Sequence, residues 1–367
     1  MSASDQAAHV TADITVVLAC HTADRWNSIV AAVESARAQQ LKPASIVVSV
    51  DHNRFLGERL RGELNGVEVV DNDSRHRGAS ATRNAGAAAA RTNFVAFLDD
   101  DETAAPDWIT ALIAPFADPA VVGTGGLYRP NWLARKPAWF PDEFAWAVGG
   151  SFTGMPTEPA RVRNVWSGNM AVRTAAFRAV GGFRGGFGKL AGQSRPEDTD
   201  LCIRVAAASR GHWVYVPDAV IEHEVPANRS TFAFFIRRSF AEGKGKIEMR
   251  AQLANSLAGG HDSHGGHVRA GTLANETSYL THTLPRGFVR HLCEGAPGFA
   301  RSGAIAIGVV AAGAGAATAV LATLGTAGRR SLAEHQHSDG ASSAAAPTQT
   351  ATAVEPIGAV AAAEPVS

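Results

Sequence analysis

The sequence predicts an α/β protein with a mostly parallel central sheet flanked by helices. Three observations support this class. Short apolar runs alternate with helix-patterned segments through the first half of the chain. Polar residues follow each apolar run, as they do at the carboxyl ends of parallel strands. The chain has 367 residues, of which 46% are hydrophobic, and so has enough apolar material for a large core.

The first apolar run, residues 14–19, has the length and composition of a buried strand. A helix is expected at 28–40, where Ile29, Val33 and Ala36 recur at helical spacing. The same reasoning applied along the first half gives strands at 46–50, 67–70 and 93–98, with helices at 54–64 and 78–91.

The second half carries weaker but similar signals. A loop at 166–168 leads into a strand ending near residue 172, and a helix at 174–180 stops at two glycines. Pro196 suits the start of the next helix, whose first turn is acidic. A short strand follows at 214–216.

Four consecutive carboxylates, Asp99 to Glu102, directly follow the predicted strand 93–98. Adjacent like charges at the end of a buried strand are unfavourable unless a cation neutralises them. Oxygen ligands suit Mg²⁺ or Mn²⁺, which also bind substrate phosphates. In an extended chain Asp99 and Asp101 project to one side, so the pair can share one metal. The alternative is a solvated acidic loop or a helix N-terminus.

A second acidic cluster contains Glu197, Asp198 and Asp200. These residues either stabilise the positively polarised first turn of a helix or supply a carboxylate that acts as a general base. His223 follows a further apolar run and is either a metal ligand or a surface histidine.

Composition and the absence of certain motifs argue against a nucleic-acid partner, a disulfide-stabilised fold and the common nucleotide-binding loops. Lysine plus arginine equals aspartate plus glutamate at 34 each, so no global charge favours nucleic acid as a partner. The three cysteines are far apart, which argues against a disulfide framework. Neither a dinucleotide-binding glycine pattern nor a P-loop follows the first strand, so a phosphate site would depend on a metal and side chains.

The C-terminal part differs from the rest of the chain. Residues 303–327 carry no charge, and as a helix of ~38 Å they would be long enough to cross a hydrocarbon core of ~30 Å. A membrane helix is therefore expected there, and a buried or surface-lying helix is the alternative. The expected organisation is a disordered segment at 1–12, a catalytic domain at 13–250, a flexible His/Gly-rich linker at 251–275, a helical region at 276–328 and a disordered tail at 329–367.

These clusters, in this order, resemble the family 2 glycosyltransferases of GT-A fold over about residues 13 to 245. The resemblance is carried by short runs that occur in register: TVVLACHT at 15–22 with Arg25, VVSVD at 47–51, RGASATRNAG at 77–86, FLDDD at 97–101, SGNMA at 167–171, VGGF at 180–183 and EDTDL at 197–201.

By that resemblance, a nucleotide-diphosphate sugar binds the N-terminal sheet, and Mn²⁺ or Mg²⁺ carries its diphosphate. The resemblance implies that Asp198 is the catalytic base of an inverting transfer and that Asp99, Asp101 and His223 are the metal ligands. The residues implied to bind the nucleotide sugar are Thr22, Arg25, Asp51, Arg83, Asp99, Asn169 and Glu197.

The processive-synthase motif Gln-x-x-Arg-Trp is not found, so a single sugar addition is favoured over polymerisation. The segment 135–154 is similar to glucosyl-dolichyl-phosphate glucuronosyltransferases, which implies a lipid-linked or cell-surface glycan acceptor. With a donor in the cytoplasm and an acceptor in the bilayer, the enzyme is expected at the cytoplasmic face of the cell membrane, anchored by the apolar C-terminal helix. Its aromatic residues, Trp139, Phe140, Phe144 and Trp146, either line an acceptor groove or pack under the sheet.

Two other functions are alternatives. A nucleotidyltransferase that makes the activated sugar shares a related sheet but usually carries a glycine-rich loop after the first strand, where this chain has ACHTAD at 19–24. A non-catalytic protein that binds nucleotides or glycans is disfavoured because every acidic position needed for the chemistry is filled.

Overall fold

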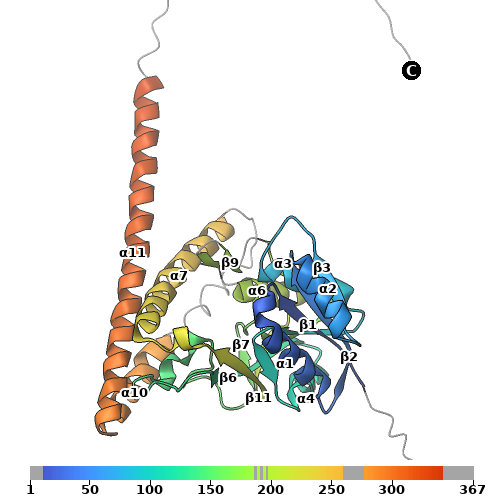
Figure 1. The fold of residues 1–367 in the computed structure, drawn as a ribbon. Helices are drawn as coiled ribbons and strands as arrows, with labels where there is room; N and C mark the ends of the chain where they lie inside the picture. Colours follow the sequence, from blue (N-terminus) through green and yellow to red (C-terminus); the bar gives the residue numbers. More distant parts are fainter. Residues whose placement is uncertain (1–10, 186–187, 191–192, 196, 259–276, 342–367) are drawn as a thin grey trace, which may run out of the picture. The chain divides into compact units, whose positions relative to one another are not determined.

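The computed structural model describes residues 11–341 except 186–187, 191–192, 196 and 259–276, and the side chains of 188–190, 193–195, 249–258 and 324–341 are not described. The chain divides into two compact units, Met1–Ala319 and Val320–Ser367. The first unit contains the sheet and the helices that cover it (Figure 1).

The first half of the sheet is parallel, as the sequence predicts. Its strands lie in the order β3-β2-β1-β4, and every neighbouring pair runs in the same direction. Helices connect the strands, because parallel neighbours need a crossover. The elements are β1 (Thr11–Cys20), α1 (Trp26–Arg37), β2 (Lys42–Asp51), α2 (Arg54–Glu63), β3 (Glu68–Asn72), α3 (Ala79–Ala89) and β4 (Phe94–Asp99).

The second half of the sheet is mixed. Strand β8 lies antiparallel between β4 and β6, and β11 runs parallel to β6 and antiparallel to β5 and β7. The α/β class is confirmed, while the described strands past β4 add antiparallel pairings to the parallel core. These elements are β5 (Glu102–Ala104), α4 (Trp108–Ile113), η2 (Ala114–Ala117), β6 (Val121–Trp132), β7 (Ala160–Val162), β8 (Asn169–Arg173), α5 (Thr174–Ala179), α6 (Glu197–Ser209) and β11 (His212–Val225). A separate hairpin pairs β9 (Gly188–Leu190) with β10 (Gln193–Arg195).

Two apolar clusters sandwich the sheet because side chains of a strand alternate between its faces. Val16 and Leu18 of β1 pack into the cluster with Ile29, Val33 and Leu56 of the helices. Their neighbour Val17 faces the other cluster, which contains Phe97, Phe177, Phe183 and Leu201. The sheet is therefore covered on both faces, and Asp51 and Asp99 lie at the edge where β1, β2 and β4 end.

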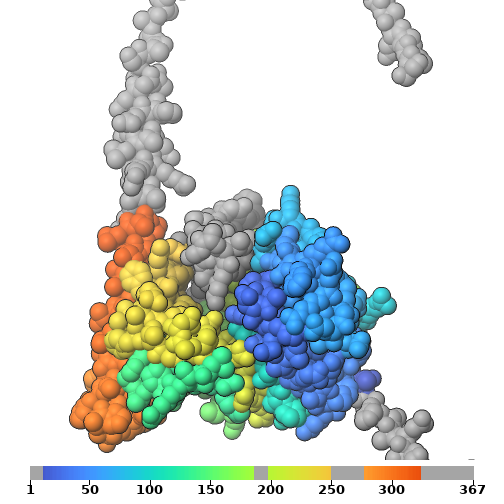
Figure 2. All heavy atoms as spheres, viewed as in Figure 1, coloured from blue at the N-terminus to red at the C-terminus, as the bar shows by residue number. Residues whose placement is uncertain are grey.

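A third apolar cluster joins the C-terminal helices to the sheet domain. Phe140 and Phe144 pack with Phe235 of α7 and with Ala304 and Ile305 of α11. Figure 2 shows the atoms of these segments, in green, yellow and orange, massed together. The elements are η3 (Asp142–Val148), η1 (Ala23–Arg25), η4 (Ala227–Arg229), α7 (Phe232–Ala258), η5 (Tyr279–Thr283), α10 (Leu284–Leu292) and α11 (Ala296–Ala341).

The ends of one strand and two helices differ from the expected segment boundaries. Strand β1 begins at Thr11, inside the segment 1–12. Helix α7 runs to Ala258, past the expected domain end at 250, and α11 runs to Ala341, into the segment 329–367. Both helices extend through alanine, glutamine, leucine and arginine, which are strong helix formers. The remaining parts of the expected disordered and linker segments, 1–10, 259–276 and 342–367, lie outside the described residues.

One helical stretch among the described residues, Ala296–Thr323, is long and apolar enough to cross a membrane, with a mean hydropathy of 2.1. A third of its most apolar window is nevertheless buried against protein. Gly315 comes so close to α7 that a Cβ there would lie 2.0 Å from the carbonyl oxygen of Phe240. The first part of α11 is therefore a packed helix of the domain on one side and exposed on the other.

Candidate active site

Three potential metal ligands meet where β4 leads into β5. Ligand atoms of Asp101, Glu102 and His223 all lie within 4.8 Å of one another. Antiparallel pairing of β5 with β11 sets His223 directly opposite Glu102, and the amide of Glu224 donates to the carbonyl of Asp101 at 3.0 Å. Two carboxylates and an imidazole form a donor set that suits Mn²⁺ or Mg²⁺.

The electrostatics of this group favour a bound cation. Glu102 is only 2% exposed. Burial, together with the nearby charges of Asp99 and Asp101, raises the pKa of Glu102 well above its usual range. A divalent ion would offset both the lost hydration and the repulsion among these carboxylates.

The sequence predicts that the side chains of Asp99 and Asp101 project to the same side, but in the structure they have different partners. The carboxylate of Asp99 accepts a hydrogen bond from Arg83, whereas Asp101 is grouped with Glu102 and His223. Asp99 remains a close neighbour, because its amide donates to Glu102 Oε2 at 2.9 Å. The chain turns after β4, so the alternation of an extended strand does not continue through Asp101. The sequence identifies Glu102 as part of the acidic run, but it does not predict Glu102 as a metal ligand.

Arg25 neutralises the middle of the acidic run. Its Nη1 lies 2.5 Å from Asp100 Oδ1 and 3.1 Å from Asp101 Oδ2. Burial raises the pKa of Asp100 to about 6, although the charge of Arg25 opposes the shift. Thr22 caps the short helix η1 that carries Arg25, and its hydroxyl accepts from the amide of Asp24 at 3.2 Å.

Arg83 connects the two acidic clusters. It projects from α3, is 4% exposed, and pairs with Asp99 and with Glu197, the latter at 3.8 Å. The charges of these carboxylates outweigh desolvation and raise the pKa of Arg83. Its permanent positive charge therefore lies between the metal-ligand group and the first turn of α6.

Asp198 is the carboxylate of the second cluster that is suited to accept a proton. Burial and the adjacent charge of Glu197 raise the pKa of Asp198 to about 7. Glu197 pairs with Arg83, and Asp200 pairs with Arg204 at 2.8 Å. Within the described residues Asp198 has no ion-pair partner and accepts from the amide of Thr199 at 2.6 Å. Its surroundings thus leave one acidic side chain poised near neutral pH.

Asp51 is the last residue of β2, and hydrogen bonds from neighbouring groups fix the orientation of its carboxylate. Its carboxylate accepts from Asn72 Nδ2 at 2.9 Å and from the amide of Gly78 at 2.8 Å, and it contacts His52 Nδ1 at 2.8 Å. Burial would raise the pKa of Asp51, but these hydrogen bonds outweigh it and lower the pKa. Asp51 is therefore ionised and fixed in orientation at the sheet edge.

Asn169 has a structural environment that the sequence did not reveal. The side chain is 0% exposed. Its oxygen accepts from Trp108 Nε1 at 2.7 Å, and its amide donates to the carbonyls of Leu127 and Ala219. All of these partners are protein groups, so Asn169 joins β8 to the strands β6 and β11 instead of presenting its amide to a ligand.

The aromatic residues of segment 135–154 pack in the interior. Phe140 and Phe144 are each 2% exposed, and Trp139 and Trp146 pack against the same cluster. These side chains pack, as one of the two alternatives predicts, but they pack against α7, α10 and α11 instead of under the sheet.

Comparison with known proteins gives a consistent result. The model of the family described as "Glycosyl transferase family 2" matches residues 15–181. The chain is 31% identical over 240 residues to a glucosyl-dolichyl phosphate glucuronosyltransferase of Haloferax volcanii, covering 64% of this chain and 77% of that protein. It is 28% identical over 206 residues to the succinoglycan biosynthesis protein ExoM of Rhizobium meliloti, covering 56% of this chain and 63% of that protein.

Among solved structures, the chain is similar to the mannosyltransferase PcManGT from Pyrobaculum calidifontis in complex with GDP-Man and Mn²⁺. The match has 18% identity and a TM-score of 0.49, and it covers 81% of this chain and 85% of that one.

Proposed function

The chain belongs to glycosyltransferase family 2, and from that membership we propose that it is a metal-dependent inverting enzyme that moves a sugar from a nucleotide-diphosphate sugar to a lipid-linked or glycan acceptor. The observation that carries the proposal is the juxtaposition of two unlike acidic sites. Asp101, Glu102 and His223 form a ligand group, and Asp198 is a separate carboxylate whose pKa is about 7.

The metal site fits a hard divalent cation. Asp101, Glu102 and His223 would hold Mn²⁺ or Mg²⁺, with Asp99 close by. When bound, the cation supplies charge neutralisation for the diphosphate of the donor. Arg25 and Arg83 orient the acidic residues through the ion pairs at Asp100 and Asp99.

Asp198 would act as the general base. Its carboxylate takes the proton from an acceptor hydroxyl, whose oxygen forms a bond to the anomeric carbon of the sugar. The bond from that carbon to the diphosphate oxygen breaks, and the nucleoside diphosphate leaves with the bonding pair. A single displacement of this kind inverts the anomeric configuration.

The donor is proposed to lie over the ends of β1, β2 and β4. Asp51 would accept hydrogen bonds from the base or ribose, and Thr22, Arg25, Arg83, Asp99 and Glu197 would contact the rest of the donor. For Asn169 we propose a positioning role, because its side chain is enclosed by protein groups.

The acceptor class and location rest on the relative from Haloferax volcanii, whose name specifies a dolichyl phosphate substrate, and on the apolar helix α11. We propose a membrane-associated enzyme that works at the cytoplasmic face. Alkaline carbonate washing of membranes tests the mode of attachment: retention indicates an integral helix, whereas release indicates a helix that lies on the surface.

The deciding experiment is a thermal-shift screen of nucleotide sugars with and without Mn²⁺, followed by sugar release from the best binder. Metal-dependent binding and release are expected, and Asp101→Asn should abolish release. Activity that survives both EDTA and Asp101→Asn would refute the metal role. Pyrophosphate formation from a nucleoside triphosphate and a sugar phosphate would favour the nucleotidyltransferase, and binding without release would favour the non-catalytic protein.

A further inference from the structure

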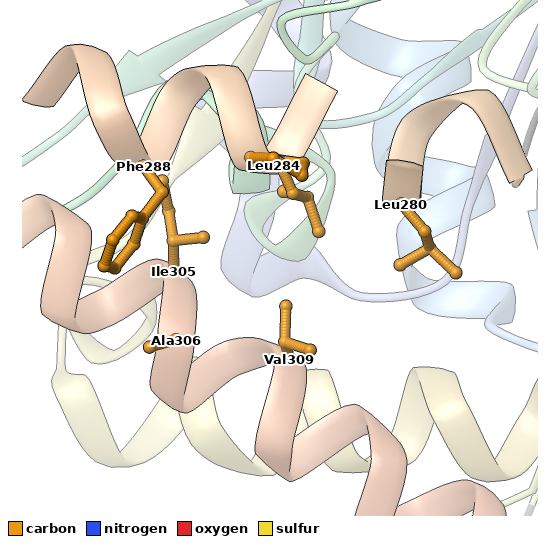
Figure 3. A pocket seen from close by; sticks show the side chains of 7 residues that line it. Leu280, Leu284, Phe288, Ile305, Ala306 and Val309 are labelled. Carbon is orange, nitrogen blue, oxygen red and sulfur yellow. The ribbon is translucent and has the colours of Figure 1, made fainter. Parts of the chain in front are cut away.

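An apolar pocket of about 390 Å³ lies between η5, α10 and α11 (Figure 3). Every side chain that lines it is apolar: Leu280, Leu284, Phe288, Ile305, Ala306 and Val309 point toward the space, together with one proline. The volume falls in the range of pockets that bind small ligands, and an apolar cavity of this kind binds apolar molecules in preference to water.

The pocket has a buried inner wall and an exposed outer rim. Leu284 and Ile305 are 4% and 3% exposed and belong to the third apolar cluster, whereas Leu280 and Val309 are 55% and 40% exposed. Further exposed apolar side chains lie on α10 and α11, namely Val289, Leu292, Phe299 and Val310. An apolar pocket flanked by exposed apolar side chains is typical of a ligand groove or a membrane contact.

Helix η5, which contributes Leu280 to the pocket, contacts segment 142–154, and the same segment touches the candidate metal ligand His223. Tyr279 donates its hydroxyl hydrogen to the carbonyl of Glu143 at 2.7 Å. A Cβ on Gly154 would lie 2.5 Å from Thr283 Oγ1, and a Cβ on Gly149 would lie 2.6 Å from His223 Cε1. Segment 142–154 therefore contacts both η5, which contributes Leu280 to the pocket, and His223 of the metal-ligand group.

We propose that this pocket binds the hydrocarbon chain of a lipid-linked acceptor, with the head group directed past segment 142–154 toward His223. The proposal deepens the proposed function and rests on it. A hydrocarbon chain is the matching occupant because the lining offers no polar side chain to orient a polar ligand. The apolar helix α11 would keep the pocket close to lipid, and exposed Arg286 on α10 suits an anionic lipid phosphate.

The test uses the full-length protein and a photo-crosslinkable geranylgeranyl phosphate, with labelled peptides identified by mass spectrometry. Labelling is expected at residues 280–309 and should be displaced by geranylgeranyl phosphate but not by inorganic phosphate. Ala306→Phe fills the pocket from an exposed position and should reduce labelling at least tenfold. The matched control is Val310→Phe, because Val310 is on the same helix and 71% exposed but does not line the pocket.

Three outcomes would overturn the proposal. Labelling that Ala306→Phe leaves unchanged means that the chain binds elsewhere. Equal loss in Ala306→Phe and Val310→Phe means that the helices merely partition into lipid. Labelling that appears only after truncation beyond residue 341 means that the C-terminal tail is the native occupant. Because crosslinking needs no catalysis, a protein that is labelled as expected but fails the nucleotide-sugar screen contradicts the proposed function and not the pocket.

A kinetic measurement then connects the pocket to the reaction. Ala306→Phe should raise KM at least tenfold for an acceptor carrying a twenty-carbon chain, because the added ring takes the place of several methylene groups of that chain in the pocket. The same variant should leave the donor thermal shift, and kcat with a five-carbon acceptor, unchanged. A matching rise in KM for both acceptors would refute chain recognition.

Discussion

Gly149 lies against the imidazole of His223. At this position the backbone has φ +85°, and an added Cβ would lie 2.6 Å from His223 Cε1 and 3.0 Å from Nδ1. The glycine ends η3 in the left-handed region and so brings the chain onto the ring without a side chain between them. This contact positions a candidate metal ligand from a segment far away in sequence.

Gly149→Ala is therefore expected to weaken Mn²⁺ binding by about 10- to 100-fold, because the new methyl group displaces the His223 ring from its ligand position. Gly181→Ala is the matched control, since Gly181 has φ +73° with no atom within 4 Å of the added Cβ. Both variants carry a similar backbone penalty of ~1 kcal/mol. Mn²⁺ titrations followed by thermal stability distinguish them, and equal affinity in the two variants would disprove the positioning role.

The pH dependence of transfer should report the ionisation of Asp198. Because the base must be unprotonated and its pKa is about 7, kcat/KM should rise with pH and level off above neutrality. Glu197→Gln removes a neighbouring negative charge, which should shift the rise to lower pH. Asp200→Asn is the control, because Asp200 pairs with Arg204. An unchanged midpoint in Glu197→Gln would show that another group controls the profile.

Asp198 should also affect stability in a predictable direction. Its folded-state pKa is raised from about 4 to about 7, so the folded protein favours the protonated form, and this contribution to stability is lost as pH rises through 7. Asp198→Asn is neutral throughout and should exceed the wild type in unfolding free energy at high pH by about 4 kcal/mol, since each pH unit between the two pKa values is worth ~1.4 kcal/mol. The difference should vanish at low pH. Urea unfolding across this range measures it, and a variant that is less stable at high pH would contradict the prediction.

The contact between α7 and α11 can be tested with two nearby glycines. A Cβ on Gly315 would lie 2.0 Å from the carbonyl oxygen of Phe240, whereas one on Gly313 meets nothing within 4 Å. Gly315→Ala should therefore destabilise the protein by ~1–3 kcal/mol through overpacking. Gly313→Ala should be neutral or stabilising by up to ~1 kcal/mol, because alanine is the better helix former.

Thermal unfolding compares the two glycine variants, and hydrogen exchange locates the effect. Gly315→Ala should increase exchange in the part of α7 around Phe240, and Gly313→Ala should leave it unchanged. If both variants behaved alike, α11 would not pack on α7 in solution.

The parallel half of the sheet was predictable because its signals are local. Each of β1, β2 and β4 is a short apolar run followed by a polar residue, and parallel strands align those polar ends at one edge. The antiparallel insertion of β8 between β4 and β6 was not predictable, since it depends on pairings between strands distant in the chain. The C-terminal ends of α7 and α11 also lie beyond the expected segment boundaries, because composition alone does not mark where a helix stops.

The sequence by itself determined the fold class, the family and the two acidic clusters, because these depend only on the order and spacing of residues. Tertiary structure alone decided which carboxylates meet. The turn after β4 and the pairing of β5 with β11 bring Glu102 to His223 while Asp99 faces Arg83. It also decided that Asn169 is enclosed and that Gly149 touches His223. The physical reason is that side-chain direction and burial depend on partners brought together only by folding, whereas chemical type and strand length are already present in the chain.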